Sequence, residues 1–238
     1  MMHDPRSPHR PDAGHPTDLQ PTIPVVSINR DSYDAIAAEW DAARSAFRGD
    51  ERRYLETLLE GLPTPSSVLD VGCGTGRPMA EFLLRHSRRG GHRVTGIDQS
   101  AALLAVAARR FPEATWVQAR IEEYPFDGRH DAVICWDSLF HIERVHHDRI
   151  LTAIHRCLAP GGRLMLTVGG SEHPAFTDTM FGRRFFYDSH PPRRVLDMLV
   201  EIGFDVLVGE FTDEPTGGRD KGRYAIVARK GGDGADRR

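Results

Sequence analysis

Residues 68–78 read VLDVGCGTGRP, an apolar run that passes directly into a glycine-rich turn. The run suits a buried strand, and Pro78 suits the first position of a helix. Glycine allows positive φ and lets a ligand approach the backbone closely. The stretch therefore predicts a strand, a ligand-binding turn that contains Gly72, Gly74 and Gly76, and a helix.

The rest of the chain repeats this alternation of strand and helix. Strands are expected at 68–71, 93–97, 115–118, 131–136, 163–168, 204–211 and 222–228, and helices near 78–89, from a cap at Ser100, and near 146–158 and 195–202. The predicted fold is α/β, a doubly wound, mostly parallel seven-stranded Rossmann-like sheet with helices on both faces. Ligands of such sheets bind in the crevice at the carboxyl ends of the strands.

The two ends of the chain differ from this pattern. Residues 1–28 carry six prolines among polar residues, and residues 231–238 are also polar, so both are predicted to be disordered tails. One folded domain is expected at 29–230. Within it, residues 170–190 are rich in aromatic residues and turn formers, which predicts a small insertion after the fifth strand.

Charge and cysteine content exclude several classes of protein. The 31 basic and 34 acidic residues leave a formal charge of -3, so nothing draws the chain to nucleic acid or to an anionic membrane. Three widely spaced cysteines suit reduced thiols better than disulfides or a zinc site, and no metal is expected. No signal peptide and no apolar run of roughly 20 residues is present, which predicts a cytoplasmic protein.

Two carboxylates accompany the glycine turn. Asp70 precedes it, and Asp98 ends the next strand, where a carboxylate can accept both hydroxyls of a ribose. A nicotinamide-binding fingerprint would have a third glycine where Arg77 stands, and a P-loop needs a lysine, whereas no lysine precedes Lys221. The turn therefore suits an adenosyl group without a pyrophosphate.

On these residues the segment 33–230 resembles the class I S-adenosylmethionine-dependent methyltransferases of the small-molecule type, over about four fifths of the chain. The resemblance implies that residues 70–76 hold the methionine part of the cofactor and that Asp98 holds its ribose. The cofactor set that it implies comprises Tyr33, Asp70, Gly72, Cys73, Gly74, Gly76, Asp98, Gln99, Arg120, Ile121 and Cys135.

Two of these positions keep an alternative. Tyr33 is similar to a tyrosine that reaches the cofactor carboxylate in that family, but packing in the core explains it almost as well. Arg120 replaces an aspartate that often contacts the adenine amino group. Adenine recognition is therefore expected from the backbone of residues 119–121, with Ile121 packed on the ring.

The segment 135–141, CWDSLFH, follows the fourth strand and lies at the expected position of the methyl group. It lacks the Asn/Asp-Pro-Pro-Tyr/Phe pattern of enzymes that methylate bases or amides. Because transfer from a sulfonium needs mainly alignment, and a base only for a protonated nucleophile, His141 is the single base candidate, with a packing role as its alternative. His146 and His147 are expected to face solvent.

The insertion at 170–190 is interpreted as a lid over an acceptor pocket, or equally as a satellite core or a dimer surface. The expected acceptor contacts are Trp136, Ser138, Arg183, Tyr187 and His190. The predicted function is methyl transfer from S-adenosyl-L-methionine to O, N or C of a small molecule by a monomer or homodimer. An NAD(P)-dependent oxidoreductase and a non-catalytic cofactor-binding domain are the alternatives.

Overall fold

A computed structural model describes residues 25–85, 91–218 and 220–232. Most of the two predicted tails, 1–24 and 233–238, therefore lies outside the described residues. The predicted boundary at residue 28 is wrong, because helix α1 (Val25–Ala35) begins before it. Asn29 and Ser32 of α1 hydrogen-bond to the backbone of Phe186 and Arg184, which holds the helix against β7.

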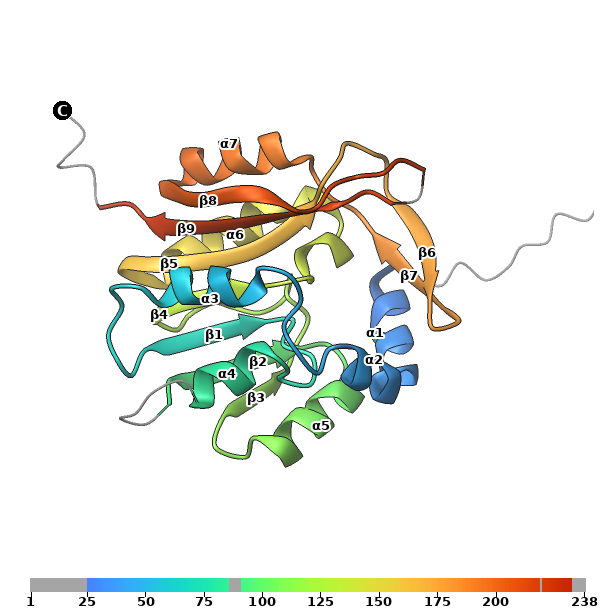
Figure 1. The fold of residues 1–238 in the computed structure, drawn as a ribbon, viewed down its shortest axis with the longest axis horizontal. Coiled ribbons are helices and arrows are strands. Elements are labelled where there is room, and N and C mark those ends of the chain that lie inside the picture. The colour runs from blue at the N-terminus through green and yellow to red at the C-terminus, as the bar shows by residue number, and fades with distance from the viewer. Residues whose placement is uncertain (1–24, 86–90, 219, 233–238) are drawn as a thin grey trace, which may run out of the picture.

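The centre of the molecule is a seven-stranded sheet in the order β3-β2-β1-β4-β5-β9-β8, which confirms the predicted fold class (Figure 1). All neighbours are parallel except β9, which is antiparallel to both β5 and β8. The strands are β1 (Ser67–Val71), β2 (Arg93–Asp98), β3 (Thr115–Gln118), β4 (His130–Cys135), β5 (Leu158–Gly169), β8 (Phe204–Asp213) and β9 (Arg223–Lys230).

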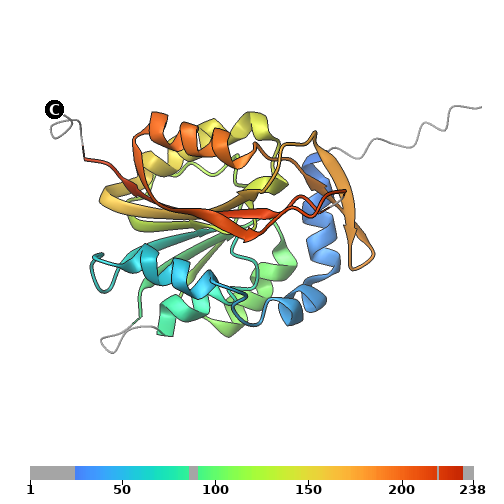
Figure 2. The same cartoon turned by 45° about the horizontal axis from the view of Figure 1, so that its top comes forward.

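Helices cover both faces of the sheet (Figure 2). Alternate residues of β1 point to opposite faces, so Leu69 and Val71 pack with α6 (His147–Cys157) and α7 (Pro192–Ile202). Val68 packs on the other face with α3 (Glu51–Leu59) and α4 (Met79–Arg85). Helix α5 (Ala101–Arg110) lies against β2 and β3, and Ser100 caps it by accepting a hydrogen bond from the Leu103 N–H, as predicted.

Two additions stand at the carboxyl edge of the sheet. Helices α1 and α2 (Ala37–Ala43) lie there beside a hairpin of β6 (Phe176–Met180) and β7 (Arg183–Tyr187), which forms the insertion after β5 (Figure 1). Tyr33, Leu103 and Phe185 belong to one small core that joins α1, α5 and β7. The N-terminal helices and the insertion therefore cover the strand ends together.

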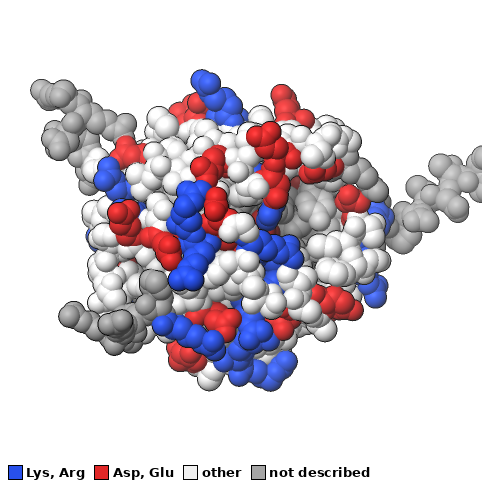
Figure 3. All heavy atoms as spheres, in the orientation of Figure 1, with Lys and Arg blue, Asp and Glu red and all other residues white. Residues whose placement is uncertain are grey.

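Acidic and basic side chains are interspersed over the face seen in Figure 3. Exposed ion pairs one helical turn apart, such as Arg52 with Glu56 and Arg193 with Asp197, occur on the helices. This face shows no continuous basic surface of the kind that follows a phosphate backbone. No helix among the described residues has the length and apolar content needed to cross a membrane.

Candidate functional site

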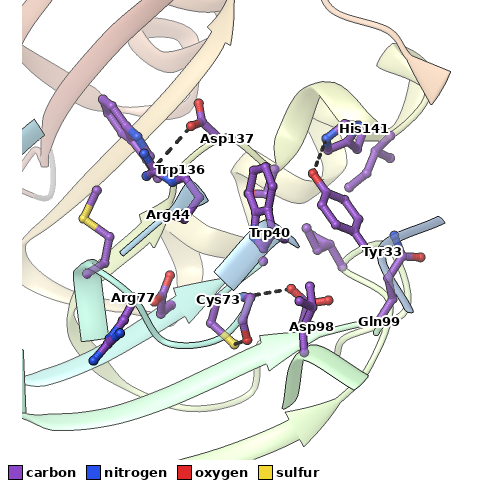
Figure 4. Close-up of a pocket in the computed structure, with 18 of the residues that line it drawn as sticks. Tyr33, Trp40, Arg44, Cys73, Arg77, Asp98, Gln99, Trp136, Asp137 and His141 are labelled. Carbon is purple, nitrogen blue, oxygen red and sulfur yellow. Dashed lines mark hydrogen bonds and ion pairs between the residues drawn. The ribbon is translucent and has the colours of Figure 1, made fainter. Parts of the chain in front are cut away.

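A cavity lies where the carboxyl ends of β1, β2 and β4 meet helices α1 and α2 (Figure 4). The glycine turn forms its floor, and the segment after β4 forms one wall. Its lining comprises Tyr33, Trp40, Arg44, Asp70, Gly72, Cys73, Gly74, Arg77, Met79, Asp98, Gln99, Leu103, Ile121, Glu122, Trp136, Asp137, Ser138, His141 and Ile142. We call it the first cavity.

The glycine turn binds β1 to β2 by backbone hydrogen bonds. The N–H groups of Gly72 and Cys73 donate to the Ile97 carbonyl at 2.8 and 3.0 Å, and the Gly74 N–H donates to Asp98 Oδ2 at 2.9 Å. Gly72 has φ +77°, and a Cβ there would lie 2.4 Å from Cβ of Ser138. Glycine is therefore required at this position both by the backbone angle and by the approach of the post-β4 segment.

Two buried carboxylates lie in this cavity. Burial, followed by the nearby charge of Asp98, raises the pKa of Asp70 to about 7. Burial also raises the pKa of Asp98, although hydrogen bonds from the N–H groups of Ser100 and Gly74 oppose the shift. Because each negative charge disfavours the other, a cationic group bound between them would stabilise both ionised carboxylates.

Aromatic side chains from the N-terminal helices cover the turn. A Cβ on Gly74 would lie 3.3 Å from Nε1 of Trp40, and the rings of Trp40 and Tyr33 pack edge to face with centroids 5.2 Å apart. Tyr33 packs in the same way on Phe185 of β7 at 4.8 Å. Sequence reasoning missed Trp40, which lies in α2, the helix that follows the one containing Tyr33.

His141 has no free basic nitrogen in this structure. Its Nδ1 lies 3.0 Å from the Phe186 carbonyl, which can only accept, so Nδ1 carries the proton. Its Nε2 lies 3.0 Å from the Tyr33 hydroxyl oxygen and accepts the hydrogen bond that this hydroxyl donates (Figure 4). Burial lowers the pKa of His141 to about 4, so the ring is neutral. A base role for His141 would require Tyr33 to move or to relay the proton.

Asn29 fixes this arrangement. Its side-chain amide donates to the carbonyls of His141 and Phe186 at 3.1 and 3.0 Å, and its Oδ1 accepts from the Phe186 N–H at 2.7 Å. Asn29 is 2% exposed, so these bonds are protected from water. Helix α1 thereby joins the hairpin to the segment after β4.

A network of buried and partly buried charges forms the wall beside Trp136. Asp137, which has φ +51°, lies 4.0 Å from the Arg44 guanidinium and 2.8 Å from that of Arg223. Arg44 also pairs with Glu51 at 2.9 Å, and Glu51 accepts the Trp136 indole N–H at 3.0 Å. The indole N–H is thus already bonded within the protein, although the ring lines the cavity as expected.

A second cavity lies beneath the hairpin. It is bounded by β6 and β7, the end of β5 and the loop that leads into β9, and it is lined by Phe140, Gly169, His173, Phe176, Asp178, Tyr187, Asp188, Ser189, Asp213, Asp220, Lys221, Gly222 and Arg223. The two cavities share a wall, because Asp137 of the first is bonded to Arg223 of the second. The rings of His141 and Tyr187, one from each cavity, are 4.9 Å apart.

Most of the predicted site residues come together. The first cavity contains Tyr33, Asp70, Gly72, Cys73, Gly74, Asp98, Gln99, Ile121, Trp136, Ser138 and His141, and the second contains Tyr187. Sequence reasoning missed Arg44 and Glu122 in the first and His173 and Arg223 in the second. No sequence motif marks these residues, because each comes from a segment without a recognisable pattern.

Five predicted residues line neither of these cavities: Gly76, Arg120, Cys135, Arg183 and His190. A Cβ on Gly76 would meet Phe111 and Trp116 at 3.0 Å, so this glycine serves packing. Arg120 pairs with Glu122 and Glu123. Cys135 is fully buried with its Sγ 3.2 Å from Ser138 Oγ, and Arg183 is exposed at the hairpin turn.

His147 was expected to face solvent and does not. It is fully buried, its Nε2 bonds to the Ile142 carbonyl at 3.1 Å, and its ring lies against that of His190. The reason is its position on the inward face of α6. Among the described residues no group of three or more His, Cys, Asp or Glu is placed to hold a metal ion.

Known proteins that this chain resembles include several methyltransferases. A family model described as a methyltransferase domain matches residues 68–162. The dTDP-4-amino-2,3,4,6-tetradeoxy-D-glucose N,N-dimethyltransferase of Saccharopolyspora spinosa is 30% identical over 201 residues, which cover 83% of this chain and 78% of that protein. Trans-aconitate 2-methyltransferase of Methylobacterium nodulans is 33% identical over 135 residues, 53% of this chain and 48% of that protein. The chain thus spans about half the length of the trans-aconitate methyltransferases that it matches.

A solved structure shares the fold over almost the whole chain. The 1,6-didemethyltoxoflavin-N1-methyltransferase of Burkholderia thailandensis, crystallised with 1,6-didemethyltoxoflavin and S-adenosylhomocysteine, superposes with a TM-score of 0.63. The match covers 95% of this chain and 100% of that one at 24% identity. At this identity the likeness concerns the fold.

Proposed function

The chain belongs to the class I S-adenosylmethionine-dependent methyltransferases, and from this we propose that it transfers a methyl group from S-adenosyl-L-methionine to O, N or C of a small molecule. The relatives named above are methyltransferases that differ in acceptor. Their names include a carboxylic acid and an amino sugar, so they support the reaction and leave the acceptor open. The NAD(P) alternative is not favoured.

The observation that carries the proposal is the contact between the turn and the acid of the next strand. Asp98 Oδ2 lies 2.9 Å from the Gly74 nitrogen, so a nucleoside whose ribose hydroxyls bond to Asp98 would lie directly on the glycine turn. The buried acids Asp70 and Asp98 fit a cationic ligand. When bound, S-adenosylmethionine supplies an electrophilic methyl group on a sulfonium that departs as a neutral thioether.

The other residues of the first cavity then have proposed roles. Ile121 would pack against adenine, and Gln99, which follows Asp98 in the chain, would contact the ribose. Tyr33 and Trp40 exclude water from the methionine part. The acceptor occupies the second cavity, with its reactive atom at the shared wall near Asp137 and Phe140.

Calorimetric titration with S-adenosylhomocysteine tests the cofactor site. We expect saturable binding by the parent protein and a loss of about 10- to 100-fold in Asp98→Asn, because hydrogen bonds to a charged group contribute about 1.5–3 kcal/mol. Asp197→Asn, on the exposed face of α7, is the matched control and should bind as the parent does. Equal affinity of Asp98→Asn and the parent, or saturable binding of NAD(P) in place of the thioether, would contradict the proposal.

A further inference from the structure

The second cavity has an acidic lining. Among its described lining residues are four carboxylates, at Asp178, Asp188, Asp213 and Asp220, against one lysine and one arginine, and Asp188 is also paired with Arg144 behind the lining. The arginine, Arg223, is shared by two carboxylates, since its Nε bonds to Asp213 at 2.7 Å and its Nη1 bonds to Asp137 at 2.8 Å. Its charge is therefore already balanced before any ligand binds.

Two further lining residues, Lys221 and Asp220, are hydrogen-bonded to neutral groups, so these bonds leave the excess negative charge of the lining unchanged. The Lys221 ammonium donates to the Gly218 carbonyl at 2.6 Å. Asp220 accepts from the Thr216 hydroxyl and the Gly222 N–H, both of them neutral donors. A positively charged ligand would be attracted to this lining, and a carboxylate ligand would be repelled.

His173 adds a basic nitrogen to the same cavity. Its Nδ1 lies 2.8 Å from the Pro174 carbonyl and must donate to it, so the lone pair is on Nε2. Nε2 lies 3.5 Å from the position of a Cβ on Gly169, which also lines the cavity, and within the described parts of the chain it has no hydrogen-bond partner. His173 is 8% exposed, and its Nε2 is not one of the fully enclosed unpaired atoms of the described residues, so this nitrogen can accept a hydrogen bond from a ligand in the cavity.

The surroundings hold this histidine in place. Arg144 bonds to the His173 carbonyl and also pairs with Asp188, and the His173 ring packs edge to face on Phe176 with centroids 5.0 Å apart. His141, on the shared wall, differs from His173 because its Nε2 already accepts a hydrogen bond from the Tyr33 hydroxyl. A proton from an acceptor in the second cavity can therefore be received by His173 without rearrangement.

We propose that the acceptor is a protonated amine carried on an aromatic or otherwise apolar group, and that His173 takes its proton; this inference rests on the proposed methyl transfer. The acidic lining attracts R–NH3⁺, and Phe140, Phe176 and Tyr187 contact its apolar part. One N–H proton passes to Nε2 of His173. The freed lone pair then forms the N–C bond to the methyl group while the S–C bond breaks and its electrons stay on sulfur. His173 afterwards releases the proton to solvent.

Binding of two matched probes tests the preference for an amine. With S-adenosylhomocysteine saturating, 2-phenylethylamine and phenylacetate are titrated at pH 7 and followed by ligand-observed NMR. We expect the amine to bind at least about 10-fold more tightly than the acid. Asp220→Asn should narrow this difference, whereas the Asp197→Asn control should not.

Several outcomes overturn the inference. It fails if phenylacetate binds as well as the amine or better, or if neither probe binds while S-adenosylhomocysteine still does. In both cases the proposed methyl transfer stands. If S-adenosylhomocysteine itself does not bind, the proposed function fails first, so the two failures are distinguishable.

A pH profile tests the role of His173. Parent and His173→Gln are compared for N-methylation of 2-phenylethylamine by mass spectrometry. At pH 7 we expect the variant to have about 100-fold lower kcat, with unchanged affinity for S-adenosylhomocysteine, because a positioned base contributes at least that much. Near pH 10 the free amine needs no base, so the two rates should converge. A ratio that is constant with pH, or binding of the amine without methylation, overturns the assignment.

Discussion

The two cavities are built in different ways. The first is formed largely by neighbouring parallel strands and the turns that follow them, and the backbone N–H groups of Gly72 and Gly74 donate to the Ile97 carbonyl and to Asp98 Oδ2 at 2.8 and 2.9 Å. The second is formed by a hairpin, two loops and side-chain ion pairs from segments far apart in the chain. The first cavity depends on backbone geometry and so has little freedom to vary. The second depends on side chains, so it can change its ligand while the fold is kept.

The largest effect is expected from a methyl group on the glycine turn. In Gly72→Ala the new Cβ meets Ser138 at 2.4 Å at a φ of +77°, which should destabilise the protein by about 3 kcal/mol and abolish binding of S-adenosylhomocysteine. Gly182→Ala has a similar φ of +73° with no atom within 4 Å, so it measures the cost of the backbone angle alone, about 1 kcal/mol. Urea unfolding would measure the stability of the two variants, and calorimetry would measure their binding of S-adenosylhomocysteine. Equal losses in the two variants would mean that the close approach of the post-β4 segment is unimportant.

An intermediate effect is expected at Asp70 and should depend on pH. Its pKa of about 7 in the folded protein lies above the ordinary value of 3.8, so the folded protein holds a proton that the unfolded chain has lost between these pH values. The contribution of Asp70 to stability is therefore full below pH 4 and is lost as the pH rises through 7. Asp70→Asn has no such loss, so its stability relative to the parent should rise from pH 5 to pH 8.

Through Asp70, cofactor affinity should depend on pH in the opposite direction from stability. A cationic ligand favours ionised Asp70, so affinity of the parent for S-adenosylmethionine should increase between pH 6 and 8, and that of Asp70→Asn should stay flat. Unfolding curves and titrations at several pH values would show both trends. Parallel curves for the two proteins would assign the titration to another group.

The smallest effect concerns the contact between α1 and the shared wall. Tyr33→Phe removes the donor to His141 Nε2 and leaves a buried acceptor unpaired, at a cost of about 1–2 kcal/mol. Tyr124→Phe, on a tyrosine whose hydroxyl has no hydrogen bond within the described residues, is the control and should cost less than about 0.5 kcal/mol. Thermal unfolding would compare them. A cost at Tyr33 no greater than at Tyr124 would mean that α1 is held by packing alone.

Sequence reasoning succeeded where the signal is local. The glycine turn, the Ser100 cap and the position of Asp98 at the end of β2 all follow from short stretches with few conformational choices. It failed for His147, expected in solvent but buried, and it left out His173 and Trp40. A single histidine or tryptophan has no local partner that reveals which way it will face.

The sequence by itself determined the alternation of strands and helices, the turn between β1 and α4, and the acid beside it, since these depend on backbone angles and on neighbours within a few residues. Only the tertiary structure decided that the Tyr33 hydroxyl donates to Nε2 of His141, that Asp137 and Arg223 form a wall between two cavities, and that Nε2 of His173 has no hydrogen-bond partner among the described residues. These contacts join segments 45 to 108 residues apart in most cases, such as Tyr33 to His141 and His141 to Phe186. Hydrogen bonds and ion pairs of this kind depend on distance and direction in the folded chain, which no pattern along the sequence encodes.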